Sequence, residues 1–348
     1  MSDGVEREVL ETKRHRTAYL AAGDPSRTVM IFVHGWPELS HSWRHQLPVF
    51  AGLGFRVIAP DMRGYGGSSV YTRHEDYALE HAVADMIELL DHLGAERAIW
   101  VGHDWGAPAV WSIAQHHPER CIGIANLCVP YQPEGFAAET CIPLVDRRVY
   151  PEEDYPAGQW DYQLFYRENF PAAQASMEAN VVNTVRALFR AGGKAGVGKP
   201  AVTSAIRRAG GWFGGIGEAP PVPRDDRVLS AEEEALYVEA LTRNGFFGPN
   251  SWYMNASANL AFALKAKETW RLKMPVLFLH GAYDFVCATV DTKLADPMRA
   301  HVDALTEGIV ESGHWMAQER PHEVNAALSE WIMTSLPHVW PGVPLRAR

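Results

Sequence analysis

The sequence predicts an α/β protein whose mostly parallel, doubly wound sheet is interrupted by a helical insertion. Three observations support this fold class. Short β-rich apolar runs alternate with amphipathic stretches in the first third of the chain, helical stretches replace them from about residue 131, and strand character returns near residue 275. We therefore expect a core of residues 1–130 and 263–348, with residues 131–262 inserted as a helical lid.

The first third contains three predicted strands and two predicted helices. Residues 29–33, 55–59 and 98–101 are β-rich runs that each end at a turn, a proline or a glycine, which is typical of buried parallel strands. Between them, residues 79–93 place apolar side chains at helical spacing, and residues 108–116 form a second predicted helix. This alternation is the βαβ pattern of a doubly wound sheet.

The rest of the chain continues the pattern after the insertion. Helical stretches are predicted around residues 173–190 and 231–244, with a glycine-rich link between them and no convincing strand. Strands are predicted at 275–280 and 308–311, and an amphipathic helix at 323–336 closes the fold.

Composition and charge exclude several classes of protein. Hydrophobic residues make up 47% and charged residues 21% of the 348 positions, which is ordinary for a folded domain and too apolar for a disordered one. Lys and Arg total 32 against 42 Asp and Glu, and the net charge of -10 has the wrong sign for binding phosphates or anionic lipid. We expect neither a nucleic acid nor a membrane partner.

Segment and cysteine patterns point to a cytoplasmic protein without a metal centre. No apolar run approaches the roughly 20 residues of a membrane span, and the first sixteen residues lack the apolar stretch that a secretory signal requires. The cysteines show neither CxxC pairing nor metal-finger spacing, so we interpret them as small core residues. They are Cys121, Cys128, Cys141 and Cys287.

The pentapeptide GHDWG at 102–106 follows a predicted strand and opens a predicted helix. This is the setting of a nucleophile elbow, G-x-Nu-x-G, whose glycines permit a tight, strained turn that exposes the central side chain. The central residue is Asp104, and a carboxylate there can displace a leaving group from saturated carbon and form an alkyl ester. The alternative is that Asp104 only caps the helix N-terminus.

A carboxylate nucleophile needs a base that delivers water and an acid that orients the base. In a fold with such an elbow, the chain order is nucleophile, acid, histidine. Asp284 lies just beyond the predicted strand 275–280 and His314 just beyond the strand that ends at 311, so both fall where strand ends meet a crevice. We predict that Asp284 orients His314, which acts as the base.

Other side chains compete for these roles. The chain holds 15 histidines, so residue type alone does not select the base. His314 is preferred because it follows a strand and a glycine, whereas His103 is interpreted as a core residue beside the elbow. Glu134, after a predicted strand at 122–129, is the rival acid.

An oxyanion forms when the ester is attacked, and backbone N–H donors must be in place to receive it. HGWP at 34–37 ends a predicted strand in the position of a second oxyanion loop. We therefore assign the backbone amides of Trp36 and Trp105 to this task. The alternative for HGWP is a simple proline turn.

Together these residues resemble the epoxide hydrolase branch of the α/β-hydrolase superfamily. HGWP, DMRGYGGSS at 61–69, GHDWG and the late Asp and His carry the resemblance, which spans about residues 25–335 and does not include the N-terminal phosphatase domain of the vertebrate enzymes. DYQLFYREN at 161–169 and RNGFFGPNSWYMN at 243–255 look like the two lid motifs of soluble epoxide hydrolases. The match places the paired tyrosines of the family at Tyr162 and Tyr253.

The resemblance implies an enzyme that adds water to an epoxide and yields a vicinal diol through an ester on Asp104. Two phenols can protonate the alkoxide that ring opening leaves, and no cofactor is needed. The implied partner is a small-molecule epoxide, and the protein is expected to be a monomer or homodimer. The alternatives are a haloalkane or haloacid dehalogenase, which needs no such acid, and a catalytically silent ligand receptor.

One further motif resembles a phosphate-binding loop but lacks its context. GKAGVGK at 193–199 fits G-x-x-x-x-G-K, yet Pro200 replaces the required Ser or Thr and no strand precedes it. We interpret it as a flexible link within the lid.

Overall fold

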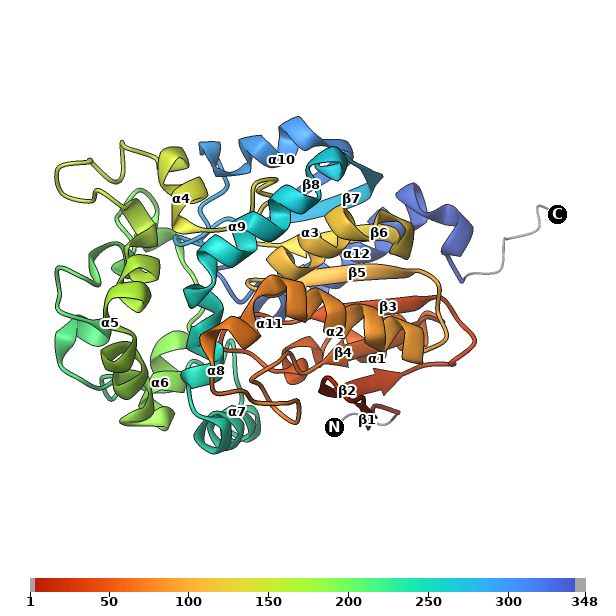
Figure 1. Ribbon diagram of the computed structural model, residues 1–348, viewed down its shortest axis with the longest axis horizontal. Coiled ribbons are helices and arrows are strands. Elements are labelled where there is room, and N and C mark those ends of the chain that lie inside the picture. The colour runs from red at the N-terminus through yellow and green to blue at the C-terminus, as the bar shows by residue number, and fades with distance from the viewer. Residues whose placement is uncertain (1–3, 342–348) are drawn as a thin grey trace.

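A computed structural model describes residues 4–341 of the protein. Its strands form one sheet in the order β1-β2-β4-β3-β5-β6-β7-β8 (Figure 1). β1 pairs antiparallel with β2, and β2 with β4, whereas every other neighbouring pair is parallel. The strands are β1 Glu6–Glu11, β2 Arg16–Ala22, β3 Val29–Val33, β4 Arg56–Pro60, β5 Ala98–His103, β6 Cys121–Leu127, β7 Leu272–Gly281 and β8 Val302–Val310.

Helices cover both faces of the sheet, which confirms the predicted doubly wound α/β class. α2 and α3 pack together on one face, and α1 and α12 lie on the other (Figure 1). The helices are α1 Leu47–Gly52, α2 Leu79–His92, α3 Gly106–His116, α4 Ala138–Cys141, α5 Asp161–Glu178, α6 Val181–Leu188, α7 Ala231–Asn244, α8 Phe247–Ser251, α9 Ala256–Lys265, α10 Asp296–His301, α11 Met316–Glu319 and α12 Pro321–Ser335.

The central strands are buried along their whole length. Every residue of β3 and of β5 is buried, which matches the near-continuous apolar runs in their sequences. The predicted strand at 29–33 coincides with β3, and those at 55–59 and 98–101 overlap β4 and β5. Their carboxyl ends lie at the same edge of the sheet, where the candidate site forms.

The inserted segment is helical, as the sequence predicts. Helices α4 to α8 gather at one end of the sheet (Figure 1), and no strand occurs within residues 131–262 of the described chain. The predicted stretch 173–190 is two helices, α5 and α6, and α5 begins earlier than expected and is kinked at Asn169, two residues before Pro171. The proline explains the kink because it cannot donate the helical hydrogen bond.

The expected boundary between core and lid does not coincide with the end of a helix. α9 runs across the expected boundary at 262/263 and packs against α2 of the core, where Asn259 Oδ1 accepts a hydrogen bond from Leu79 N. The outermost residues of the expected core, 1–3 and 342–348, lie outside the described chain. Within that chain, none of the helices has the length and apolar character that a bilayer crossing requires.

Candidate active site

Asp104 occupies a strained turn between β5 and α3. Its φ of 47° lies in the left-handed region, which non-glycine residues rarely adopt outside functional turns. The flanking glycines are required by space: a Cβ at Gly102 would lie 2.4 Å from Asn126 Oδ1, and one at Gly106 only 2.1 Å from Val33 O. The turn therefore has the geometry of the predicted nucleophile elbow.

His314 and Asp284 meet Asp104 although they come from the far end of the chain. His314 Nδ1 lies 2.8 Å from Asp284 Oδ2, and His314 Nε2 lies 3.5 Å from Asp104 Oδ2. The backbone N–H groups of Val286 and Cys287 donate to Asp284 Oδ1 at 3.1 and 2.9 Å. The buried acid is thus oriented by its own loop, and it orients the imidazole in turn.

The electrostatics of this group favour a charged acid and a basic imidazole. Burial would raise the pKa of Asp284, but His314 and the hydrogen bonds to the carboxylate lower it overall. Burial would likewise lower the pKa of His314, yet the carboxylates of Asp284 and Asp104 hold it well above its usual range. Loss of the charge on Asp104 would therefore remove one of the causes that keep His314 protonated.

The predicted oxyanion loop lies against the elbow. Trp36 N donates to Asp104 Oδ1 at 2.6 Å. Gly35 makes this approach possible, because a Cβ there would lie 2.4 Å from Asp104 Oδ1 and 2.6 Å from Trp105 N. The amide of Trp36 is thus adjacent to Oδ1, the amide of Trp105 lies next to the same glycine, and Oδ2 is left facing His314.

The two tyrosines of the inserted segment lie over the elbow. The rings of Tyr162 and Tyr253 are 5.4 Å apart and inclined by 77°, and both line the cavity that contains Asp104. Burial is the main cause that raises the pKa of both phenols well above 10, and neighbouring groups that include the Asp104 carboxylate raise it further. Both therefore carry their protons at neutral pH and can donate them.

A cavity of about 480 Å³ joins these groups. This volume is within the range of small-molecule sites. Its wall is largely aromatic next to the reactive groups, so an apolar substituent can be held beside the carboxylate. Lining residues include Trp36, Asp104, Tyr162, Trp212, Tyr253 and His314.

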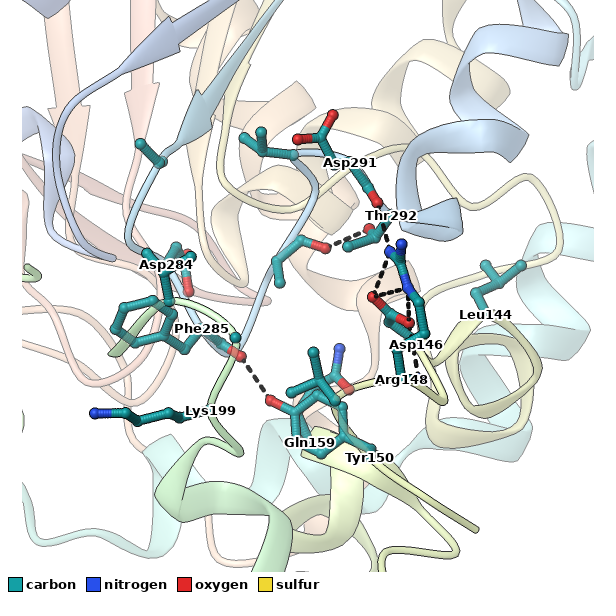
Figure 2. A pocket seen from close by; sticks show the side chains of 17 residues that line it. Leu144, Asp146, Arg148, Tyr150, Gln159, Lys199, Asp284, Phe285, Asp291 and Thr292 are labelled. Atoms are coloured by element: carbon teal, nitrogen blue, oxygen red, sulfur yellow. Dashed lines mark hydrogen bonds and ion pairs between the residues drawn. The ribbon is translucent and has the colours of Figure 1, made fainter. Parts of the chain in front are cut away.

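A second cavity, of about 500 Å³, lies between the inserted segment and the loop after β7 (Figure 2). Asp284 and Phe285 line both cavities. Tyr150 Oη donates to the Phe285 carbonyl oxygen at 3.3 Å, and this bond is drawn in Figure 2. Neither Asp104 nor His314 lines the second cavity, so we assign it no part in catalysis.

Two further buried residues lie next to the His314 loop. On sequence alone, Glu38 has no assigned role and His103 is interpreted only as a core residue. Glu38, which follows HGWP directly, lies 2.7 Å from His103 Nδ1, and His103 Nε2 lies 2.7 Å from the backbone oxygen of His314. Both neighbours of the His103 ring are acceptors when Glu38 is ionised, so both ring nitrogens carry protons. Despite burial, Glu38 raises the pKa of His103, and His103 lowers that of Glu38 to about 2.

The remaining candidates do not compete for the site. Glu134 is exposed and does not contact His314 within the described chain, so of the two predicted acids Asp284 is the one that the structure places next to His314. All four cysteines are buried and unpaired by disulfide. Cys128 lies with His103 and His314, and Cys287 lies with Asp284 and His314, each group with ligand atoms within 4.8 Å of one another. In both groups imidazole nitrogens already have hydrogen-bond partners, since His103 Nε2 faces the His314 carbonyl oxygen and His314 Nδ1 faces Asp284 Oδ2.

Sheet order, elbow and triad geometry define an α/β-hydrolase, and comparison with known proteins gives the same class. Residues 28–321 match the alpha/beta hydrolase fold family, so the chain belongs to that family. Within it the chain is 35% identical to epoxide hydrolase A of Mycobacterium tuberculosis, covering 93% of this chain and 96% of that relative. The protein is therefore a member of the epoxide hydrolase branch.

Other relatives agree. The chain is 34% identical to bifunctional epoxide hydrolase 2 of Sus scrofa over 86% of its own length and spans about half of that protein, 50%. The crystal structure of epoxide hydrolase A from Mycobacterium thermoresistibile superposes with a TM-score of 0.77 at 31% identity, covering 95% of this chain and 98% of that one.

Proposed function

We propose that the protein is a cofactor-independent epoxide hydrolase that converts an epoxide into a vicinal diol through an ester on Asp104. The observation that carries the proposal is the meeting of Asp104, His314 and two protonated phenols on one cavity. The chain also belongs with proteins named as epoxide hydrolases. The substrate partner is accordingly a small-molecule epoxide.

In the first step the carboxylate of Asp104 opens the ring. Oδ1 accepts from Trp36 N, so Oδ2 is the oxygen left to attack the epoxide carbon. The carbon–oxygen bond of the ring breaks, and Tyr162 and Tyr253 donate to the departing oxygen, which would otherwise be a poor alkoxide leaving group. The product is an alkyl ester on Asp104 that carries a neighbouring hydroxyl group.

In the second step water cleaves the ester. The ester carries no charge, so one of the causes that raise the pKa of His314 is gone, and the imidazole releases its proton more readily and can act as base in its neutral form. His314 takes a proton from water, the hydroxide attacks the carbonyl carbon of Asp104, and Asp284 stabilises the imidazolium. The amides of Trp36 and Trp105 receive the oxyanion. When it collapses, the departing diol oxygen takes the proton from the His314 imidazolium, and the proton of the acid left on Asp104 returns to the phenolate, which restores the carboxylate, the neutral imidazole and both phenols.

The phenols favour an epoxide over the alternatives. A dehalogenase expels halide, which needs no proton donor, so two protonated phenols at the reacting centre would have no task. A ligand receptor on this fold would not require the hydrogen-bonded order of Asp284, His314 and Asp104. A substrate panel of styrene oxide, aliphatic epoxides and short haloalkanes separates the three functions.

The direct test of the mechanism is a single turnover in oxygen-18 water. Because water attacks the ester carbonyl, the label should enter Asp104 and be absent from the first-turnover diol, which mass spectrometry of peptide and product measures. His314→Gln should still form the ester and then stall, so that intact mass shows protein plus substrate. Label in the first-turnover diol would remove Asp104 as nucleophile.

A matched histidine variant controls for folding. His322 is exposed on α12, and His322→Gln should turn over at the native rate without trapping ester. If His314→Gln neither traps ester nor loses turnover, the base lies elsewhere. A cytoplasmic location, the monomeric or homodimeric state and the core and lid division are further parts of this proposal.

A further inference from the structure

The loop that carries His314 is held at three consecutive backbone positions. On one side, the His314 carbonyl oxygen accepts from His103 Nε2 at 2.7 Å. On the other side, Glu319 Oε2 accepts from Gly313 N at 2.9 Å and Glu319 Oε1 accepts from Trp315 N at 3.1 Å. The carboxylate of Glu319 therefore fixes the amide on each side of the base.

The same carboxylate also binds the inserted segment. Glu319 Oε2 accepts a third bond, at 3.1 Å, from Gly192 N. Gly192 and Gly313 touch backbone to backbone, because a Cβ on Gly192 would lie 2.4 Å from Gly313 Cα. No side chain could stand between the two segments, so the contact requires glycine on both.

Two further contacts make this a joint between lid and core. Trp315 Nε1 donates to the Leu188 carbonyl oxygen at 2.9 Å, and the rings of Trp315 and Phe189 stack at 4.4 Å. Leu188 and Gly192 also line the cavity above Asp104. Movement of this part of the lid would thus be passed to the residues next to His314.

We propose that Glu319 is a positioning residue that sets the backbone of the His314 loop and couples it to the lid at Gly192. The inference rests on the proposed function, because His314 matters as the base of ester hydrolysis. Bonds from three N–H groups to one carboxylate are charge-assisted and stronger than neutral ones. A base displaced by about 1 Å can lose about a hundredfold in rate, so this support bears on the second chemical step.

Asp225 provides a matched control on the same segment. Asp225 Oδ2 accepts from Ala191 N at 3.1 Å, one residue before Gly192, and thus holds the segment from the lid side. It makes no hydrogen bond or ion pair with residues 313–315 of the described chain. Asp225→Asn therefore loosens the lid segment and leaves the Glu319 bonds to Gly313 N and Trp315 N in place.

The experiment separates the two chemical steps by pre-steady-state kinetics. Glu319→Gln keeps the shape of the side chain but replaces one carboxylate oxygen by an NH₂ group, which is a donor facing backbone donors. In this variant the rate of ester formation and the burst amplitude should be native, while ester decay should slow about tenfold. Glu319→Ala should slow decay further, and Asp225→Asn, which keeps the Glu319 bonds to Gly313 N and Trp315 N, should slow it much less. A fold that is merely damaged would lower the burst amplitude instead.

Hydrogen exchange gives a second readout that does not depend on turnover. Amides 313 and 315 should exchange faster in Glu319→Gln but not in Asp225→Asn. Native ester decay in both Glu319 variants, equal slowing in Asp225→Asn, or unchanged exchange at 313 and 315 would each overturn the proposal. If the wild-type protein forms no ester with any epoxide, the proposed function fails, and the exchange data still decide whether Glu319 holds the loop.

Discussion

The two oxygens of Asp104 have different surroundings, and that difference divides the chemistry between them. Oδ1 accepts from Trp36 N, whereas Oδ2 faces His314 Nε2 at 3.5 Å. In the proposed mechanism, alkylation through Oδ2 makes Oδ1 the ester carbonyl oxygen, which already lies next to Trp36 N, where the oxyanion would form. The ground state thus preorganises the donors of the second step at no extra reorganisation cost.

The phenols of Tyr162 and Tyr253 should act on the first step only. Each Phe variant should slow ester formation by about tenfold or more, and the double variant should nearly abolish it, because general acid assistance is typically worth about 10²- to 10⁴-fold. Ester decay should change little, since it uses His314 and two backbone amides. Tryptophan quenching in stopped flow measures both rates.

Tyr166 is the matched control for these variants. It stacks on Tyr253 at 4.6 Å, its buried hydroxyl has no hydrogen-bond partner within the described chain, and it does not line the cavity. Tyr166→Phe should therefore alkylate at the native rate. A double variant at Tyr162 and Tyr253 that also alkylates normally would remove the main reason to prefer epoxides over halides.

Site residues that directly follow a strand could be predicted from the sequence, whereas those that depend on a contact between distant segments could not. Asp104, Asp284 and His314 could be proposed because each comes just after a predicted strand, and parallel strands end at one edge. Glu38 also comes after a predicted strand, directly behind HGWP, but its partner cannot be identified from the sequence. Its importance comes from contact with His103, 65 positions further along the chain.

Helices and strands differ in how well they can be predicted from their sequences. The fully buried strands β3 and β5 and the helix α7 could be located closely, and α7 also has a capping box of Ser230 and Glu233. β1 was missed because it is a partly exposed edge strand whose sequence, EREVLE, is mostly charged. The kink in α5 depends on Pro171, which a search for uninterrupted periodicity treats as a helix end.

The helix α2 is tied to its surroundings by a buried ion cluster. The side chain of Asp85 is 1% exposed and binds Arg63 Nε at 2.7 Å and Arg14 Nη2 at 2.6 Å. Arg14 lies in the turn between β1 and β2, and Arg63 follows β4. One carboxylate on the helix therefore holds two separate core segments.

Removal of this carboxylate should be costly for stability. Asp85→Ala would leave two arginines without their buried partner, and breaking a buried pair typically costs about 3–5 kcal/mol. Asp91→Ala on the same helix is the control, because its side chain is 61% exposed and its pair with Arg120 should contribute about 1 kcal/mol or less. Urea unfolding of both variants checks the difference, and equal losses would contradict it.

Across the whole molecule, buried histidines divide into two groups with opposite effects on stability. Burial lowers the pKa of His15 and of His41 to about 4, so between pH 6.5 and 4 the unfolded chain binds protons that the folded chain does not. Carboxylates raise the pKa of His103 and His314 despite burial, so above pH 6.5 the folded chain keeps protons that the unfolded chain releases. The free energy of unfolding should therefore fall both below and above pH 6.5.

We expect the free energy of unfolding to be largest near pH 6.5 and smaller at pH 5 and pH 8.5. His15 alone, with a folded pKa of about 4, should account for about 1–2 kcal/mol of the loss between pH 6.5 and 5. His15→Gln should lower the free energy of unfolding at pH 6.5, because it alters the hydrogen bond to Tyr71 Oη. The loss of unfolding free energy between pH 6.5 and 5 should be smaller in this variant by the contribution of His15. His322→Gln, at an exposed position, should keep the native slope. Urea unfolding at the three pH values measures this, and a stability that rises steadily from pH 5 to 8.5 would show that the raised pKa of His103 and His314 is wrong.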